Sequence, residues 1–169
     1  INKTGVENSS QINLEFDPNY QKIVLHRLNV IRDGKIINKL KTAKISIISN
    51  ESQLDEQIYS GSLTLNILID DVRINDTVDL SYTREGANPI YDGIFSYARS
   101  LNWSVPVFDQ YLRVLWHKDA PLHITSRNID LEIKQHDIGS ATEYEIHMHD
   151  ADTISTPSQI PNWYSPYAK

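Results

Sequence analysis

The chain contains no cysteine, so disulfides, thiolate metal ligands and a cysteine nucleophile are all excluded within its 169 residues. Glycine and proline are scarce, at 6 and 7 residues, which argues against a collagen-like or disordered chain. No apolar run approaches the roughly 18 residues that a membrane-spanning helix requires. The length suits one domain with a real hydrophobic core, and a core of that size needs no disulfide to support it.

A surplus of basic residues is also missing. The chain has 16 Lys and Arg against 22 Asp and Glu, a formal net charge of -6. Proteins that bind duplex nucleic acid usually carry a basic surplus or a clustered basic stripe. The densest basic stretch, residues 35–44, is interrupted by Ile36, Ile37, Leu40 and Ala43, and is typical of a solvated strand face. No nucleic-acid partner is expected.

Apolar and polar residues alternate along many short segments, which predicts strands with one buried face. Residues 11–16 form such a segment. Residues 22–31 and 35–40 predict a hairpin, because Asp33-Gly34 supplies the two positive-φ positions of a tight type I′ turn. Further strands are expected at residues 44–49, 62–70, 77–84, 94–101, 110–116, 122–126, 130–135 and 142–149.

One segment changes period. Leu54 and Ile58 lie four residues apart, Asn50 suits a helix start and Gly61 suits its end, so one short helix is predicted near residues 50–60. Residues 1–10 are polar and aperiodic and are expected to form a flexible N-terminal arm. Residues 154–169, with three prolines and several aromatics, predict an extended linker toward a missing downstream domain.

The intervening residues 11–153 are therefore expected to form one mainly β domain. Many short strands separated by turn signals indicate an antiparallel sandwich or barrel. A parallel α/β fold needs repeated crossover helices, and the sequence pattern lacks them.

Several motifs occur in an order that resembles a bacterial family, domain of unknown function 3857, which precedes transglutaminase-like domains. The matching segments are residues 17–20 (DPNY), 30–35 (VIRDGK), 61–65 (GSLTL), 71–76 (DVRIND), 81–83 (SYT) and 86–89 (GANP). One departure is Asn75, where the family often has glycine. Asparagine tolerates the left-handed conformation better than most residues, so the turn is expected to survive.

This resemblance implies an antiparallel two-sheet β-sandwich in a periplasmic or extracellular protein. It implies no catalytic residues and no cofactor, so none is assigned. The function it favours is a non-catalytic accessory domain that docks onto or regulates a downstream transglutaminase-like domain. The alternative is a carbohydrate- or peptide-binding β-sandwich, and an independent enzyme ranks third.

Aromatic residues are the candidates for contact with such a partner or ligand, because tryptophan and tyrosine are enriched in interfaces. Trp163, Tyr164 and Tyr167 lie in the expected linker, and Trp103 lies in a polar setting between Asn102 and Ser104. No nucleophile elbow or phosphate-binding loop is present in the sequence.

His147 and His149 are the candidate metal ligands, because residues two apart on a strand share a face. Zinc needs further ligands, and His136 is the suggestive donor. An exposed polar strand face explains the two histidines without a metal, and that interpretation is preferred. Arg32, Asp33, Asp71 and Arg73 carry charges that are expected to pair and fix two turns, which is a structural role.

Overall fold

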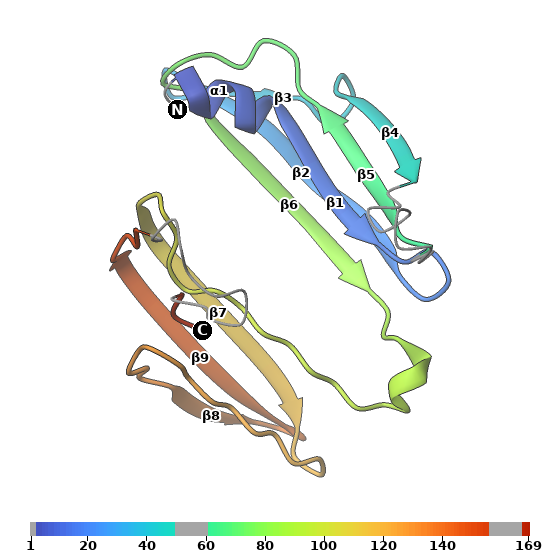
Figure 1. The fold of residues 1–169 in the computed structure, drawn as a ribbon, viewed down its shortest axis with the longest axis vertical. Helices are drawn as coiled ribbons and strands as arrows, with labels where there is room; N and C mark the ends of the chain where they lie inside the picture. The colour runs from blue at the N-terminus through green and yellow to red at the C-terminus, as the bar shows by residue number, and fades with distance from the viewer. Residues whose placement is uncertain (1–2, 50–60, 156–166) are drawn as a thin grey trace. The chain divides into compact units, whose positions relative to one another are not determined.

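The chain folds as two compact units, Ile1–Phe95 and Ser96–Lys169 (Figure 1). The computed structural model describes residues 3–49, 61–155 and 167–169, so the helix expected near residues 50–60 lies outside the described residues. Every strand pair is antiparallel, which confirms the mainly β, antiparallel prediction. No helix in the described part of the chain has the length and apolar character needed to cross a membrane.

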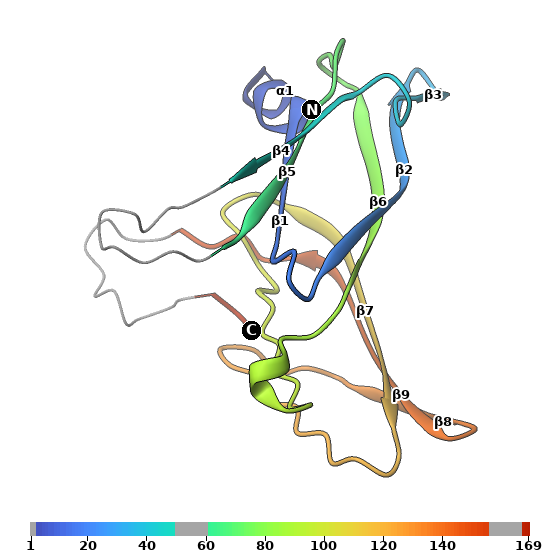
Figure 2. The same ribbon diagram turned by 90° about the vertical axis from the view of Figure 1, so that its right-hand side faces the viewer.

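The strands of residues 11–153 are divided among more sheets than the two expected for a sandwich. The described strands make three separate three-stranded sheets, two of them in the first unit and one in the second. The sheets of the first unit have the orders β1-β5-β4 and β3-β2-β6 (Figure 2). Their bounds are β1 Gln11–Phe16, β2 Lys22–Arg32, β3 Lys35–Asn38, β4 Lys44–Ser49, β5 Leu63–Leu68 and β6 Thr77–Glu85.

The core of the first unit lies between its two sheets. Leu28 and Val30 of β2 are fully buried, and both point to the same face because they are two residues apart. They pack with Leu14 of β1 and with Ile67 of β5. The alternating apolar residues in the sequence thus become the facing surfaces of the two sheets, whose burial from water stabilises the unit.

The tight turn predicted between residues 31 and 36 is confirmed. Asp33 and Gly34 have φ angles of 49° and 74°, and Arg32 pairs with Lys35 across the hairpin. Asn75, the position where the family often has glycine, also adopts a left-handed φ of 71°. Both turns therefore have the backbone geometry that their residue types predict.

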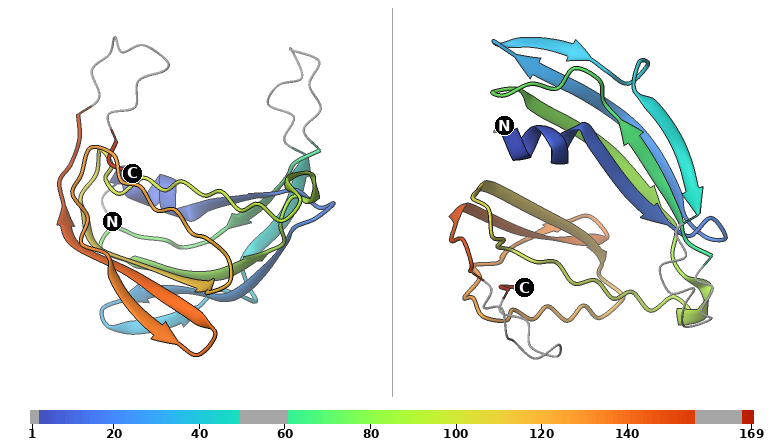
Figure 3. Two further views of the ribbon diagram at one scale, coloured as in Figure 1. Left: turned by 90° about the horizontal axis from the view of Figure 1, so that it is seen from below. Right: turned by 45° about the horizontal axis from the view of Figure 1, so that its top comes forward.

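The expectation of a loose arm over residues 1–10 is corrected, because Lys3–Ser10 forms the helix α1, which leads directly into β1 (Figure 3). The backbone N–H of Ile69 donates to the carbonyl oxygen of Ser10 at 2.8 Å and so anchors the end of α1. None of the residues of α1 is buried, so the segment has no apolar stripe from which a helix is predicted.

The second unit contains the sheet β7-β9-β8, formed by β7 Val107–His117, β8 Lys134–Ile138 and β9 Ala141–Ala151. A short 3-10 helix, η2 Pro89–Tyr91, precedes this unit in the chain.

The strands predicted at residues 94–101 and 122–126 are wrong, and the one predicted at 130–135 begins only at Lys134. Leu101 and Arg127 instead bond through their backbone N–H groups to Ala168 and Lys169, each at 2.8 Å. Their partners lie far along the chain, so local alternation does not reveal this pairing.

An ion pair with one buried partner ties the connection that precedes β6 to the end of β2. Asp76, which is 2% exposed, precedes β6, and its carboxylate accepts hydrogen bonds from Arg32 Nε at 2.9 Å and Arg32 Nη2 at 2.8 Å. The backbone N–H of Arg73 donates a third bond at 2.7 Å. These bonds, those from Arg32 above all, hold the pKa of Asp76 down to about 2.

Asp71 belongs to the same network, as expected from the sequence, whereas Asp33 is not one of its members. The Asp71 carboxylate accepts from Arg32 Nη1 at 3.1 Å and from Arg73 Nε at 2.6 Å. Hydrogen bonds from Arg73 and Arg32 lower the pKa of this carboxyl group. The sequence pattern missed Asp76, the buried partner, because aspartate is ordinary in a turn.

Gly86 and Gly34 give a matched test of the first unit's backbone. Both have positive φ, but a Cβ at Gly34 meets nothing within 4 Å, whereas one at Gly86 falls 1.8 Å from the carbonyl oxygen of Tyr20. Gly34→Ala is expected to cost about 1–2 kcal/mol in backbone strain. Gly86→Ala adds about 1–3 kcal/mol for displacing the Tyr20 backbone. Urea denaturation of both variants checks the order, and equal losses would contradict the close approach.

Asp76→Asn is expected to lower the urea midpoint of unfolding at neutral pH by more than Asp71→Asn, because only Asp76 is buried. Since the folded pKa of Asp76 is about 2, its contribution is complete above the unfolded pKa of about 4 and is lost as the pH falls toward 2. Midpoints measured from pH 6 to pH 2 should therefore show the wild type and Asp76→Asn converging. A difference that stays constant with pH would rule out the ionised Asp76 as its source.

Candidate functional site

The sheet of the second unit has one polar face. Strand alternation and the β7–β9 register place seven polar side chains from these two strands together, and His136 of β8 lies opposite one of them. The seven are Asp109, Tyr111, Arg113, Glu143, Glu145, His147 and His149. Such a concentration of titratable groups on one face makes it the candidate functional surface of this unit.

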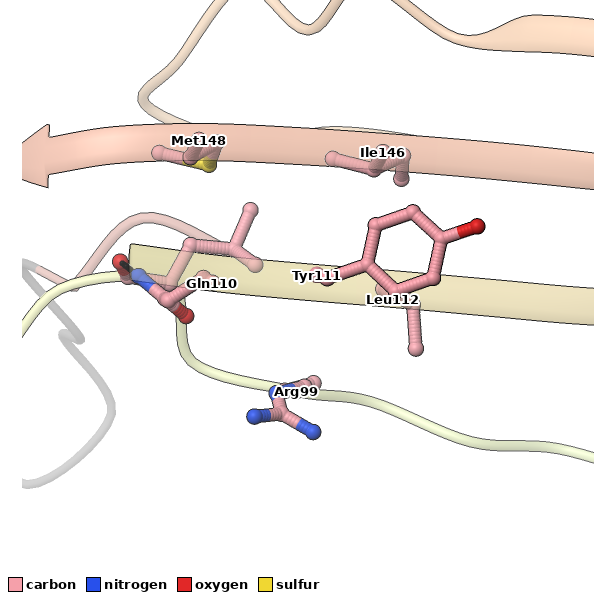
Figure 4. A pocket seen from close by; sticks show the side chains of 7 residues that line it. Arg99, Gln110, Tyr111, Leu112, Ile146 and Met148 are labelled. Carbon is pink, nitrogen blue, oxygen red and sulfur yellow. Dashed lines mark hydrogen bonds between the residues drawn. The ribbon is translucent and has the colours of Figure 1, made fainter. Parts of the chain in front are cut away.

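The opposite face is the core of the unit. Figure 4 shows Gln110 and Leu112 of β7 beside Ile146 and Met148 of β9, with Arg99 on the segment that runs alongside β7. Ile146 is 8% exposed and Leu101, which also lines this hollow, is 4% exposed. The side chain of Gln110 is buried and donates from Nε2 to the carbonyl oxygen of Leu101. Side chains fill this hollow, so it offers no ligand site.

Three side chains meet at one end of the polar face. His149 lies directly across from Asp109 in the ladder, and His147 lies on the same face two residues earlier. Asp109 Oδ1 is 2.7 Å from His147 Nε2 and 3.2 Å from His149 Nδ1. The two imidazole rings have centroids 4.2 Å apart at an interplanar angle of 48°. One carboxylate and two imidazoles thus converge on a single point.

Neighbouring side chains orient this group. The ring of Tyr111 meets the ring of His147 edge-on, with centroids 5.4 Å apart and planes at 79°. The hydroxyl of Tyr111 donates a hydrogen bond to Glu145, and this bond raises the pKa of Tyr111 above its ordinary value. Arg113 likewise donates from Nε to Glu143. The face is thus ordered by pairs that reach across the β7–β9 ladder.

His147 and His149 are neighbours on one face of β9, but the suggested third donor, His136, lies apart from them. His136 Nε2 lies 3.8 Å from Glu145 Oε2, and His136 is not part of the cluster that the described residues form. Asp109 takes its place. Sequence spacing did not identify Asp109 because it lies 38 residues from His147, and only the register of β7 against β9 brings the two together.

Trp103 lines an open hollow next to this group. The hollow has a volume of about 530 Å³, and its lining includes Arg99, Trp103, Val107, Asp109 and Tyr111. Trp103 is half-buried, and its carbonyl oxygen accepts from the backbone N–H of Ile154 at 3.0 Å. A rigid aromatic and a cation beside an open space are suited to contact with a ligand.

Of the other aromatic candidates, Trp163 and Tyr164 lie outside the described residues. Tyr167 is half-buried, and its carbonyl oxygen accepts from Asn128 Nδ2 at 3.3 Å. The next residue, Ala168, is 2% exposed and donates its N–H to Asn102 Oδ1 at 2.9 Å. The last three residues therefore pack on the second unit itself.

A hydroxyl–imidazole pair occurs in the first unit as well. His26 Nε2 lies 2.7 Å from Thr83 Oγ1, at a β-bulge between Leu25 and Arg27. A nucleophile of this kind needs a third group that orients the histidine. Among the residues that the structure describes, no carboxylate bonds to His26, whose ring is exposed. The pair is an ordinary cross-strand hydrogen bond.

The chain belongs to the family DUF3857, a domain of unknown function with a solved structure, whose model matches residues 1–155. Its fold is similar to a crystal structure described as a "putative protease" from Parabacteroides distasonis ATCC 8503, with a TM-score of 0.81 and 12% sequence identity. The match covers 99% of this chain but 33% of that one, so the chain spans about a third of the solved protein. At this identity the likeness concerns the fold. No curated protein matches the chain.

Proposed function

We propose that the chain is a non-catalytic accessory domain that docks onto or regulates a transglutaminase-like domain of the same polypeptide. The polypeptide would belong to a bacterial envelope or secreted protein. The observation that carries the proposal is the unequal coverage of the fold match, 99% of this chain against 33% of the Parabacteroides protein. The same fold therefore serves as one part of a longer protein.

The chemistry of the chain supports an accessory role. Transglutaminase-like domains use a cysteine to attack an amide, and this chain has no cysteine, so that step belongs to another part of the polypeptide. A protease also acts on an amide bond. The description of the Parabacteroides protein is therefore consistent with a catalytic domain that, like a transglutaminase-like domain, acts on amides. The family itself is defined as a domain of unknown function, and nothing in its description assigns a reaction.

The aromatic residues near the C-terminus test this proposal. Trp163→Ala is expected to leave the unfolding midpoint of the 169-residue chain nearly unchanged, while in the longer protein it uncouples two calorimetric transitions. Trp116→Ala is the matched control, because Trp116 bonds within its own unit through Nε1 to the carbonyl oxygen of Ala120 at 3.0 Å. That variant should weaken both forms alike. Equal losses in both forms for Trp163→Ala would contradict docking.

A second candidate is a carbohydrate- or peptide-binding module, favoured by the open hollow beside Trp103. Aromatic faces stack on sugar rings and on peptide side chains. A glycan array and a peptide library would identify the best ligand, and calorimetric titration would measure its affinity for the chain. If this candidate is right, Trp103→Ala lowers that affinity at least tenfold. Trp116→Ala should retain the affinity. If neither screen yields saturable binding, the binding-module candidate is contradicted and only the accessory role remains.

A further inference from the structure

We propose that Asp109, His147 and His149 form a binding site for a divalent transition-metal ion, with zinc as the ion to test. Each of the three residues offers one ligand atom, and these three atoms all lie within 4.8 Å of one another. This inference goes beyond the accessory role, because it assigns a ligand to the second unit whether or not a catalytic domain follows. Its failure and that of the accessory role are separable, since the site is complete within this chain.

The distances agree with a site that needs little rearrangement. Zinc bonds to imidazole nitrogen and carboxylate oxygen at about 2.0–2.2 Å, so two ligands of a tetrahedral ion are about 3.3–3.6 Å apart. Asp109 Oδ1 lies 3.2 Å from His149 Nδ1 and 2.7 Å from His147 Nε2. A small shift of the exposed Asp109 side chain would therefore admit an ion between the three donors.

The strand register explains why the donors converge. His147 and His149 alternate with Met148, which is half-buried and faces the core, so packing of this neighbour holds the backbone between the two histidines. Asp109 is set opposite His149 by the antiparallel ladder. Sites on regular strands hold their ligands more firmly than sites on loops. The edge-on contact with Tyr111 further limits rotation of the His147 ring.

Charge also favours a cation here. Asp109 brings one negative charge to two imidazoles, and Glu143 and Glu145 lie on the same face with their own partners. The chain as a whole has a formal net charge of -6. Two imidazoles and one carboxylate form the ligand set of zinc and non-haem iron sites that keep a coordination position open. Water would fill that position, on the exposed side of the group.

The decisive experiment titrates zinc chloride into the metal-free 169-residue chain by calorimetry. The proposal expects one ion per chain, and the same stoichiometry for cobalt(II) with the intense visible absorption of a four-coordinate ion. His147→Ala, His149→Ala and Asp109→Asn should each weaken zinc at least tenfold, since even residues behind the ligands change affinity 10–100-fold. Affinity should also fall as the pH is lowered, because protons compete for imidazole.

His136→Ala is the matched control, because His136 is a histidine of the same sheet that contacts Glu145 rather than the cluster. Its zinc affinity should stay within about twofold of the wild type, which is small compared with the 10–100-fold losses expected for changes near a metal. Unfolding midpoints without metal show that each variant still folds. The proposal is overturned if zinc does not bind saturably, or if His136→Ala weakens zinc as much as His147→Ala does. Affinity unchanged in all three ligand variants would overturn it equally.

Discussion

The interaction on which the first unit depends is the ion pair of Arg32 with the buried Asp76. Arg32 ends β2 in one sheet, and Asp76 lies between β5 of the other sheet and β6, so the pair fixes the passage of the chain from sheet to sheet. A second link runs parallel to it, from the buried Lys39 after β3 to Asp70 after β5, at 3.0 Å. Burying Lys39 and Asp76 costs desolvation, and for Asp76 a third hydrogen bond, from the backbone N–H of Arg73, helps to offset that cost.

This ionic frame matters because the apolar core is small. Among the described residues, the buried cluster of the first unit contains five side chains, surrounded by partly buried ones. Two three-stranded sheets that share so few buried residues need further restraints on their relative angle. The left-handed turn at Asn75 supplies one, because it lies in the connection from β5 of one sheet to β6 of the other. The structural residues of the family resemblance thus concentrate in the first unit.

In the second unit, the two faces of the sheet differ in what they contact. One face of the β7-β9-β8 sheet is covered by the irregular segments and by the last residues of the chain, which bond to Leu101 and Arg127. The other face carries carboxylates, histidines and a tyrosine whose positions are set by cross-strand register. The covered face stabilises the sheet, and the polar face is the candidate functional surface of the unit.

Local patterns predicted what depends on near neighbours. The period-two alternation located β1, β2, β4, β6 and β9 to within about two residues, and Asp33-Gly34 identified the hairpin turn. Contacts between distant residues were not accessible in this way. The burial of Asp76, the convergence of Asp109 with His147 and the pairing of Leu101 with Ala168 all depend on register between remote segments. The helix α1 was missed because it buries nothing.

The claim that the polar face of the second unit is a binding surface is tested most directly by anomalous X-ray diffraction. Crystals of the 169-residue chain grown with zinc would be measured on both sides of the zinc absorption edge. The account predicts one strong anomalous peak about 2.0–2.2 Å from donor atoms of Asp109, His147 and His149. A zinc peak only elsewhere on the chain, or no peak at these three residues, would contradict the proposed binding surface.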